Sequence, residues 1–281
     1  MLKKIRSLAY QYALPAAVII FVLFDLLLLG IGRLLSLLPE TLIIGYVNET
    51  ILILLPIALV FFFGFSRAFK KGSFFRGLLC VLPFLVLQLI ILIAFLSETL
   101  GNPEVNWNPW YLSVYGVFTV VGVGIREECV YRATIQNVLA KKYAGSVGGI
   151  WIAVGVSSIL FGLSHVSNLF FGMDPLAVLT QVIFSTCVGV LFGAAYLRSG
   201  SIWALIFVHT FTDIAGLAES TFIRNVSDIE DMNKMSFSWE ALAIRLVYVG
   251  IAIFLLRPSK CKQISESLCF ADEELEAAVR T

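Results

Sequence analysis

The sequence has little charge for its length. Lys, Arg, Asp and Glu make up 14% of the 281 residues, against about 25% in an ordinary soluble domain. Hydrophobic residues make up 59%, which is more apolar surface than a soluble chain of this length can hide behind a wetted exterior. The net charge of +1 argues against a strongly basic face, so we expect no nucleic-acid partner. The composition therefore indicates a chain whose solvent is lipid.

Histidine and cysteine are also scarce. The chain has only two histidines, which excludes a metal site of three histidines within one chain and leaves open a site of two histidines and one carboxylate. The five cysteines include no C-x-x-C pair, and three of them lie in apolar stretches. This pattern disfavours both a disulfide framework and a thiolate metal site.

Long apolar stretches follow one another along most of the chain. Their runs do not alternate in polarity, which favours helices over the strands of a membrane barrel. We predict an all-α fold, a polytopic transmembrane helix bundle of about eight spanning helices that forms a single integral membrane domain over 1–281. The expected spans are 13–38, 42–65, 77–97, 111–131 with a helical continuation toward Lys142, 148–170, 176–197, 201–218 and 239–256.

Basic residues are unevenly distributed among the loops. If both termini lie on one side, 16 of the 20 Lys and Arg residues fall on that side. The positive-inside rule then predicts a multi-pass membrane protein with both termini in the cytoplasm. The polar tail 259–281 is cytoplasmic in this arrangement, and the acidic loop 219–238 lies on the opposite side.

Ionisable side chains within the apolar stretches each cost about 2.5–3.5 kcal/mol on insertion scales, so each one calls for a reason. Glu128 and Arg132 are four residues apart, and this spacing lets them neutralise each other on one helix face. Glu127 lies about 100° around the helix, which leaves its carboxylate free for chemistry. An ion network at a helix end explains the same pattern equally well.

Both histidines of the chain also lie in apolar stretches. His165 follows Phe161 by four residues, and His209 precedes Asp213 by four, so His209 and Asp213 share a helix face. A single histidine in an apolar helix is more often a hydrogen-bonded packing residue. Two histidines, a spare glutamate and an aspartate together form a set suited to activating water. Small residues let the helices approach closely enough to share a polar cavity: Gly122, Gly124, Gly155, Ser157, Ser158, Gly162, Gly189 and Gly193.

Taken together, these clusters resemble the CPBP intramembrane metalloprotease family, which comprises the type II CAAX prenyl endopeptidases and Abi-like bacterial relatives linked to bacteriocin processing and immunity. The family's motifs are E-E-x-x-x-R, F-x-x-x-H and H-x-x-x-(N or D). They occur here in that order, over about 107–218, as Glu127-Glu128-x-x-x-Arg132, Phe161-x-x-x-His165 and His209-x-x-x-Asp213.

The resemblance implies an intramembrane endopeptidase whose site is buried among helices and opens toward the cytoplasm. By carry-over, Glu127 acts as general base on a water that His165 helps to hold. His209 and Asp213 are implied to stabilise the oxyanion or to orient the water. An ionised Asp213 cannot donate to an oxyanion, so orienting His209 or serving a cation is the better role for it.

The remaining motif residues, Glu128, Arg132 and Phe161, are implied to support the site. Zinc bound through His165 and His209 and a metal-free glutamate mechanism are both open. The implied partners are membrane lipid and a peptide or lipidated protein substrate, in CAAX-type or bacteriocin-type processing.

Two other functions remain open. Buried Glu, His and Asp residues also form proton relays, as in a proton-coupled transporter, although no matching second half of the sequence repeats the motif. A non-catalytic membrane scaffold or immunity factor that keeps the family's fold is the other alternative.

The expected boundaries contain one conflict. Counted from Gly148, His165 lies about 25 Å into its span at 1.5 Å per residue, whereas Glu127 lies near the cytoplasmic end of 111–131. A shared cavity requires either different boundaries or a fifth span that begins well below the membrane surface.

Overall fold

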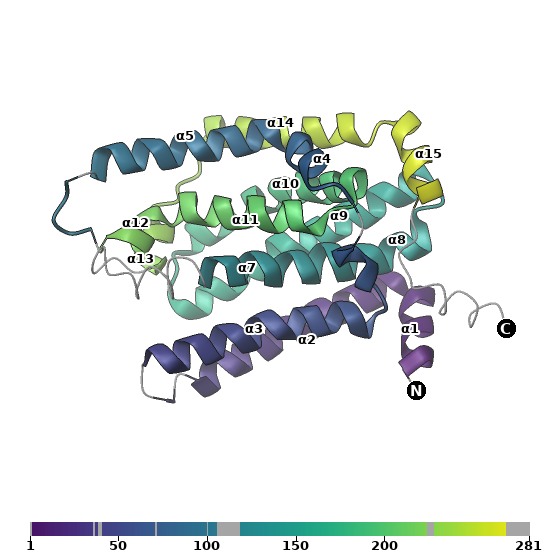
Figure 1. Ribbon diagram of the computed structural model, residues 1–281, viewed down its shortest axis with the longest axis horizontal. Helices are drawn as coiled ribbons and strands as arrows, with labels where there is room; N and C mark the ends of the chain where they lie inside the picture. The colour runs from purple at the N-terminus through teal and green to yellow at the C-terminus, as the bar shows by residue number, and fades with distance from the viewer. Residues whose placement is uncertain are drawn as a thin grey trace.

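The chain folds as a bundle of long helices joined by short turns (Figure 1). The computed structural model describes residues 2–35, 37–38, 41–70, 72–99, 101–105, 119–223 and 228–267. Within these residues the extended pairing is limited to one isolated bridge between Val105 and Ile223. The predicted all-α helical bundle is confirmed.

The N-terminal helices lie on two opposite sides of the bundle, the first three on one side and the next two on the other (Figure 1). They are α1 (Leu2–Gln11), α2 (Ala13–Leu35), α3 (Leu42–Phe62), a 3-10 turn at Ser66–Phe69, α4 (Phe74–Cys80) and α5 (Leu82–Thr99). The hydroxyl of Thr41 caps α3 by accepting a hydrogen bond from the Ile44 N–H, and Ser73 caps α4 in the same way. Each cap satisfies an amide that the first helical turn leaves without a partner.

The helices after residue 118 carry the predicted motifs. They are α7 (Thr119–Glu127), a π-helix at Glu128–Gln136, α8 (Asn137–Tyr143), α9 (Val147–Ser164), a 3-10 helix at His165–Phe171, α10 (Pro175–Ser199), α11 (Ile202–Gly216), α12 (Ala218–Phe222), α13 (Asp228–Asn233), α14 (Trp239–Leu255) and α15 (Pro258–Ser267). The consecutive segments α7, the π-helix and α8 form one helical run through the middle of the bundle (Figure 1).

The number of spans differs from the prediction. Within the described residues, five helices are long and apolar enough to cross a membrane: Ala13–Leu35, Ile43–Phe62, Leu82–Thr99, Val147–Phe171 and Pro175–Ser199. A sixth is reached only if α14 and Pro258–Ile264, bent by 65° from each other, count as one span. The described residues therefore supply five or six candidate spans, fewer than the eight that the sequence predicts.

The shortfall has a physical reason in the interior helices. A helix of the 15 residues of α11 is about 22 Å long at 1.5 Å per residue, shorter than a hydrocarbon core of about 30 Å. Because α11 is largely enclosed by other helices, it does not have to match the bilayer by itself. The expected span 111–131 lies partly outside the described residues, and its described part continues as the helical run to Tyr143.

The outer surface of the bundle is more apolar than the surface of a soluble protein. Large apolar side chains on the outer helices point outward, with Leu26 59% exposed and Phe254 64% exposed. All nine residues of the π-helix are buried, including Glu128, Arg132 and Gln136. An apolar exterior, with a few charged and polar side chains buried in a largely apolar core, is the arrangement expected for a bundle in lipid.

Close helix approaches occur where glycines face a neighbouring helix. A Cβ built on Gly162 of α9 would lie 2.1 Å from Thr186 Oγ1 on α10, and one on Gly124 of α7 would lie 2.6 Å from Thr210 Oγ1 on α11. The predicted role of small residues is confirmed at these two contacts. It is wrong at Gly155, where a Cβ would meet no atom within 4 Å.

Candidate active site

The two motif glutamates lie where the central helix changes its winding. Glu127 is the last residue of α7, and Glu128 is the first of the π-helix. The Thr134 hydroxyl donates to the carbonyl of Cys129, five residues earlier, at 2.9 Å. Such π-helical segments are rare and are frequently found at functional sites. Here the segment carries two adjacent carboxylates toward α11.

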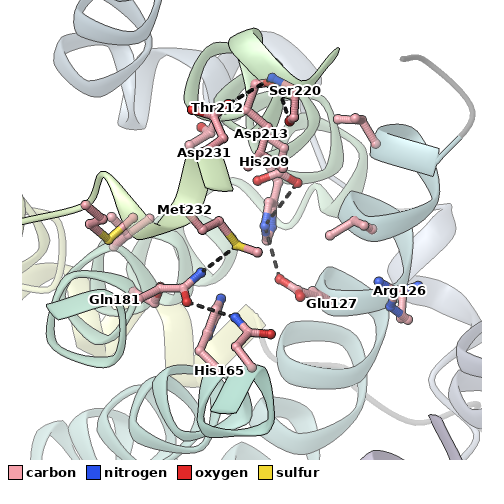
Figure 2. A pocket seen from close by; sticks show the side chains of 18 of the residues that line it. Arg126, Glu127, His165, Gln181, His209, Thr212, Asp213, Ser220, Asp231 and Met232 are labelled. Carbon is pink, nitrogen blue, oxygen red and sulfur yellow. Dashed lines mark hydrogen bonds and ion pairs between the residues drawn. The ribbon is translucent and has the colours of Figure 1, made fainter. Parts of the chain in front are cut away.

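His209 on α11 lies between these carboxylates. Its Nε2 is 3.2 Å from Glu127 Oε2 and 3.8 Å from Asp213 Oδ2 (Figure 2). Its Nδ1 is 2.7 Å from Glu128 Oε1. The side chain is only 7% exposed. An ionised carboxylate only accepts hydrogen bonds, so an imidazolium with a proton on each ring nitrogen satisfies this arrangement.

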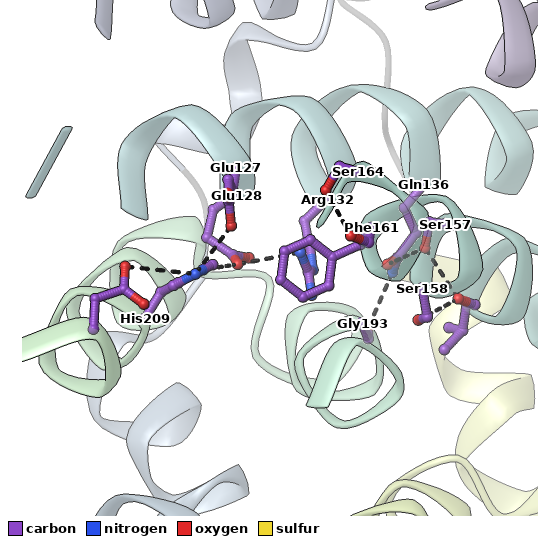
Figure 3. A network of polar contacts seen from close by, with 12 residues as sticks. Glu127, Glu128, Arg132, Gln136, Ser157, Ser158, Phe161, Ser164, Gly193 and His209 are labelled. Carbon is purple, nitrogen blue, oxygen red and sulfur yellow. Dashed lines mark hydrogen bonds and ion pairs between the residues drawn. The ribbon is translucent and has the colours of Figure 1, made fainter. Parts of the chain in front are cut away.

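Glu128 is occupied by structural contacts. Its Oε1 also lies 3.3 Å from Arg132 Nη1, which is the i,i+4 ion pair that the spacing predicted (Figure 3). The Arg132 guanidinium carbon lies 4.4 Å from the ring centroid of Phe161 and 5.6 Å from that of Phe192. Charge and aromatic faces therefore hold a buried arginine, and Glu128 links this arginine to His209.

His165 stands at the end of α9. Its Nδ1 lies 3.1 Å from the carbonyl oxygen of Phe161 and 3.5 Å from Ser164 Oγ. When Nδ1 donates to that carbonyl, Nε2 keeps its lone pair. The ring of Phe161 packs edge-on against both His165 and His209, so one aromatic side chain positions both histidines.

A large chamber brings the carried-over catalytic residues together. It has a volume of about 1360 Å³ and is lined by Glu127, His165, His209 and Asp213, together with apolar side chains of several helices. Figure 2 shows these side chains pointing into one space from α7, the end of α9, and α11. Glu128 is completely buried and does not line this chamber.

Glu127 and His165 lie at similar depth in the bundle. Glu127 precedes the end of α8 at Tyr143 by 16 residues, and His165 follows the start of α9 at Val147 by 18. At about 1.5 Å per residue, both are roughly 24–27 Å from the turn that joins these helices. The conflict in the expected boundaries came from placing Glu127 near that end of its helix, and this placement is wrong.

The residues do not form a zinc site. A structural or catalytic zinc needs at least three protein ligands directed at one point. Within the described residues, no group of three or more His, Cys, Asp and Glu side chains is arranged to hold a metal ion. Both nitrogens of His209 already face carboxylates. We therefore derive no step through a metal from His165 and His209.

Some chamber residues were not singled out by the motifs. The Asn168 amide donates to Gln181 Oε1 at 2.9 Å, and the Gln181 amide lies 4.0 Å from Met232 Sδ (Figure 2). Gln181 interrupts the apolar sequence of α10, and an uncharged polar residue in a span is the signal that identifies it. Phe192 carries no such signal, because aromatic residues are common throughout this chain.

The fold and the chamber define a polytopic helical membrane protein with a carboxylate–histidine site inside the bundle. Residues 109–215 match the family model described as type II CAAX prenyl endopeptidase Rce1-like. The resemblance to the CPBP family is thereby confirmed over the segment that holds all three motifs, and it supports a CAAX-type intramembrane protease at the level of the family. No curated protein and no solved structure matches the chain.

Proposed function

We propose that this protein is an intramembrane endopeptidase in which Glu127 activates water for peptide-bond hydrolysis. The supporting observation is the division of labour between two adjacent carboxylates. Glu128 is enclosed by Arg132 and His209, whereas Glu127 lines the large chamber beside His165 and His209. A general base has to be within reach of its water, and Glu127 is the glutamate of this pair that meets the condition.

The proposed reaction uses the proton on His209 Nε2. Glu127 takes a proton from water as the water oxygen attacks the substrate carbonyl carbon. A protonated Glu127 is a weaker acceptor for His209, so the Nε2–H becomes available to the developing oxyanion. Glu127 then returns its proton to the leaving amine as the peptide bond breaks.

Asp213 has a supporting role in this proposal. Its Oδ2 lies 3.8 Å from His209 Nε2 on the same face of α11 and has no hydrogen-bond partner within the described residues. An ionised aspartate cannot donate to an oxyanion. We therefore assign it to orienting His209 and the attacking water.

The chamber suits a peptide that carries a lipid group. Apolar side chains such as Phe84, Ile91 and Val188 line the same space as Glu127, so an apolar chain and a peptide bond fit side by side. The family-level match favours a prenylated substrate. Cleavage of an unprenylated, bacteriocin-type precursor is the alternative that a direct comparison of substrates tests.

We propose that the end of the bundle with α1 and α15 faces the cytoplasm. Lys3 and Lys4 of α1 and the last-turn Lys141 and Lys142 of α8 lie at this end, and the positive-inside rule supports the assignment (Figure 1). The large chamber extends to the opposite end, where α12 and α13 lie. If both termini are cytoplasmic, the large chamber therefore opens on the opposite side of the membrane. In this proposal the substrate enters from the outer side or from the outer leaflet.

The test is cleavage of a synthetic farnesylated peptide by purified protein in liposomes. We expect Glu127→Gln to lower the cleavage rate by about 10²–10⁴, the usual contribution of a general base. We expect His165→Ala and His209→Ala also to abolish cleavage while the proteins still insert. Glu240→Gln, which changes an exposed glutamate on α14, is the matched control and should keep full activity.

A Glu127→Gln variant with full activity would contradict the proposal. Loss of cleavage in the Glu127, His165 and His209 variants, with normal biological activity of these variants in cells, would instead favour a non-catalytic scaffold.

A further inference from the structure

A second chamber lies behind the site. It is a partly open space with a volume of about 270 Å³, lined by residues of α2 and α3, the junction of α7 with the π-helix, and the segment around His165. Glu127 and His165 line both this small chamber and the large one. The proposed base therefore borders two adjoining spaces, one toward α11 and one toward α2.

Part of the wall of the small chamber is polar. Besides Glu127 and His165, its polar wall consists of Asp25, Asn48, Arg126, Tyr131, Ser164, Ser167 and Asn168. Gly32 and apolar side chains form the rest: Phe24, Leu28, Leu29, Leu52 and Phe171. A cavity holds ordered water when it is polar and offers room for it, and a water molecule occupies about 30 Å³ in the liquid. The small chamber meets both conditions.

Asp25 is the residue whose position requires an explanation. It is the single acidic residue of α2 and lies at the middle of this 23-residue apolar helix. The face of α2 that packs against the bundle consists of small and apolar residues, Ala13, Ala17, Ile20 and Phe24, so packing does not call for a carboxylate. A carboxylate within a span is costly unless it contacts water or a partner. Asp25 lines the small chamber, and water in that chamber supplies such a contact.

Substrate and water share the large chamber in the proposed reaction. A lipidated peptide that occupies it displaces water from the side of Glu127 that faces the peptide bond. Each turnover nevertheless consumes one water molecule. A hydrated space on the other side of Glu127 supplies this water without displacing the substrate.

We propose that the small chamber holds the hydrolytic water and delivers it to Glu127, with Asp25 as the positioning residue that keeps the chamber hydrated. This inference rests on the proposed function, because it assigns a role to water in the same hydrolysis. It concerns a residue of α2, outside the segment 109–215 that matches the family model.

Water access is tested by cysteine labelling in liposomes. The five native cysteines are first replaced by alanine, and Asp25→Cys or Leu26→Cys is then introduced. A small charged methanethiosulfonate reagent is expected to label the cysteine at position 25 at least about tenfold faster, because only a hydrated thiol forms the reactive thiolate. Leu26 is the matched control, since it is 59% exposed on the lipid-facing side of α2. Equal rates, or no labelling at either position, would overturn the proposal.

A kinetic comparison tests the role of the water independently. Asp25→Leu is expected to lower kcat about tenfold at unchanged KM and without loss of thermal stability, because it removes a group needed for the chemical step only. Asp25→Asn keeps the polar contact with water and should restore most of the rate. Leu26→Ala should leave both constants unchanged.

The outcomes separate this inference from the proposed function. Wild-type kcat in Asp25→Leu would overturn the role of the small chamber and leave Glu127 as the base. Full activity in Glu127→Gln would overturn the proposed function itself.

Discussion

At the scale of single residues, two adjacent glutamates have different environments because they face different neighbours. Glu128 lies 3.3 Å from Arg132 and 2.7 Å from His209, whereas Glu127 meets His209 and two chambers. The Glu128–Arg132 pair could be predicted from the sequence, since spacing of four residues on one helix determines it. The contact of Glu127 with His209 could not, because it joins helices far apart in the chain.

Asp213 provides a prediction at this scale. We expect Asp213→Asn to keep activity within about tenfold of wild type, because the amide oxygen still accepts a hydrogen bond from His209 or from the attacking water. Asp213→Leu, which can neither orient His209 nor accept a hydrogen bond, should lower kcat/KM by at least about tenfold. Cleavage of the farnesylated peptide measures both. An Asn variant as impaired as the Leu variant would contradict the assigned role.

At the scale of elements, the boundaries of the outer helices follow closely from apolar length. The expected 13–38 is observed as Ala13–Leu35, and the expected 176–197 as Pro175–Ser199. Bilayer thickness imposes this length on helices that contact lipid. The interior helices do not have to match the bilayer thickness, and α11 is too short to span the bilayer by itself. The π-helix could not be predicted either, because no residue pattern in Glu128–Gln136 distinguishes it from an α-helix.

Helix contact through Gly162 gives a prediction for α9 and α10. Gly162→Ala should destabilise the protein by about 1–3 kcal/mol, the usual cost of overpacking, because the new Cβ meets Thr186 Oγ1 and the Val182 carbonyl oxygen. Gly155→Ala on the same helix is the matched control. It meets no atom within 4 Å and should stabilise by up to about 1 kcal/mol through helix propensity. Thermal unfolding in mild detergent measures both, and equal effects would contradict the packing.

At the scale of the whole molecule, a group of lysines and the opening of the large chamber lie at opposite ends of the bundle. The lysines of α1, α8 and α15 lie at the end of the bundle where these helices meet, whereas the large chamber extends toward α12 and α13. The orientation with cytoplasmic termini stays a prediction that rests on loop charge. The direction of the chamber could not be predicted from the sequence, since it depends on where the helical run from Thr119 to Tyr143 places Glu127.

Sidedness labelling in intact cells tests this arrangement. In the background without native cysteines, a membrane-impermeant thiol reagent should label Lys234→Cys in intact cells and Lys3→Cys only after permeabilisation. Both positions are exposed in the structure, so access depends on the side of the membrane. The reverse pattern would contradict cytoplasmic termini and would place the end with α12 and α13 in the cytoplasm.

The central claim is that Glu127 activates water without a bound metal. Its most direct test is the rate of farnesylated-peptide cleavage by purified wild-type protein and by Glu127→Gln in liposomes, each after treatment with a chelator. We expect the wild-type rate to survive the chelator and the Glu127→Gln rate to fall by at least about 10². Wild-type cleavage by the Glu127→Gln variant, or a wild-type activity that the chelator abolishes and zinc restores, would contradict the claim.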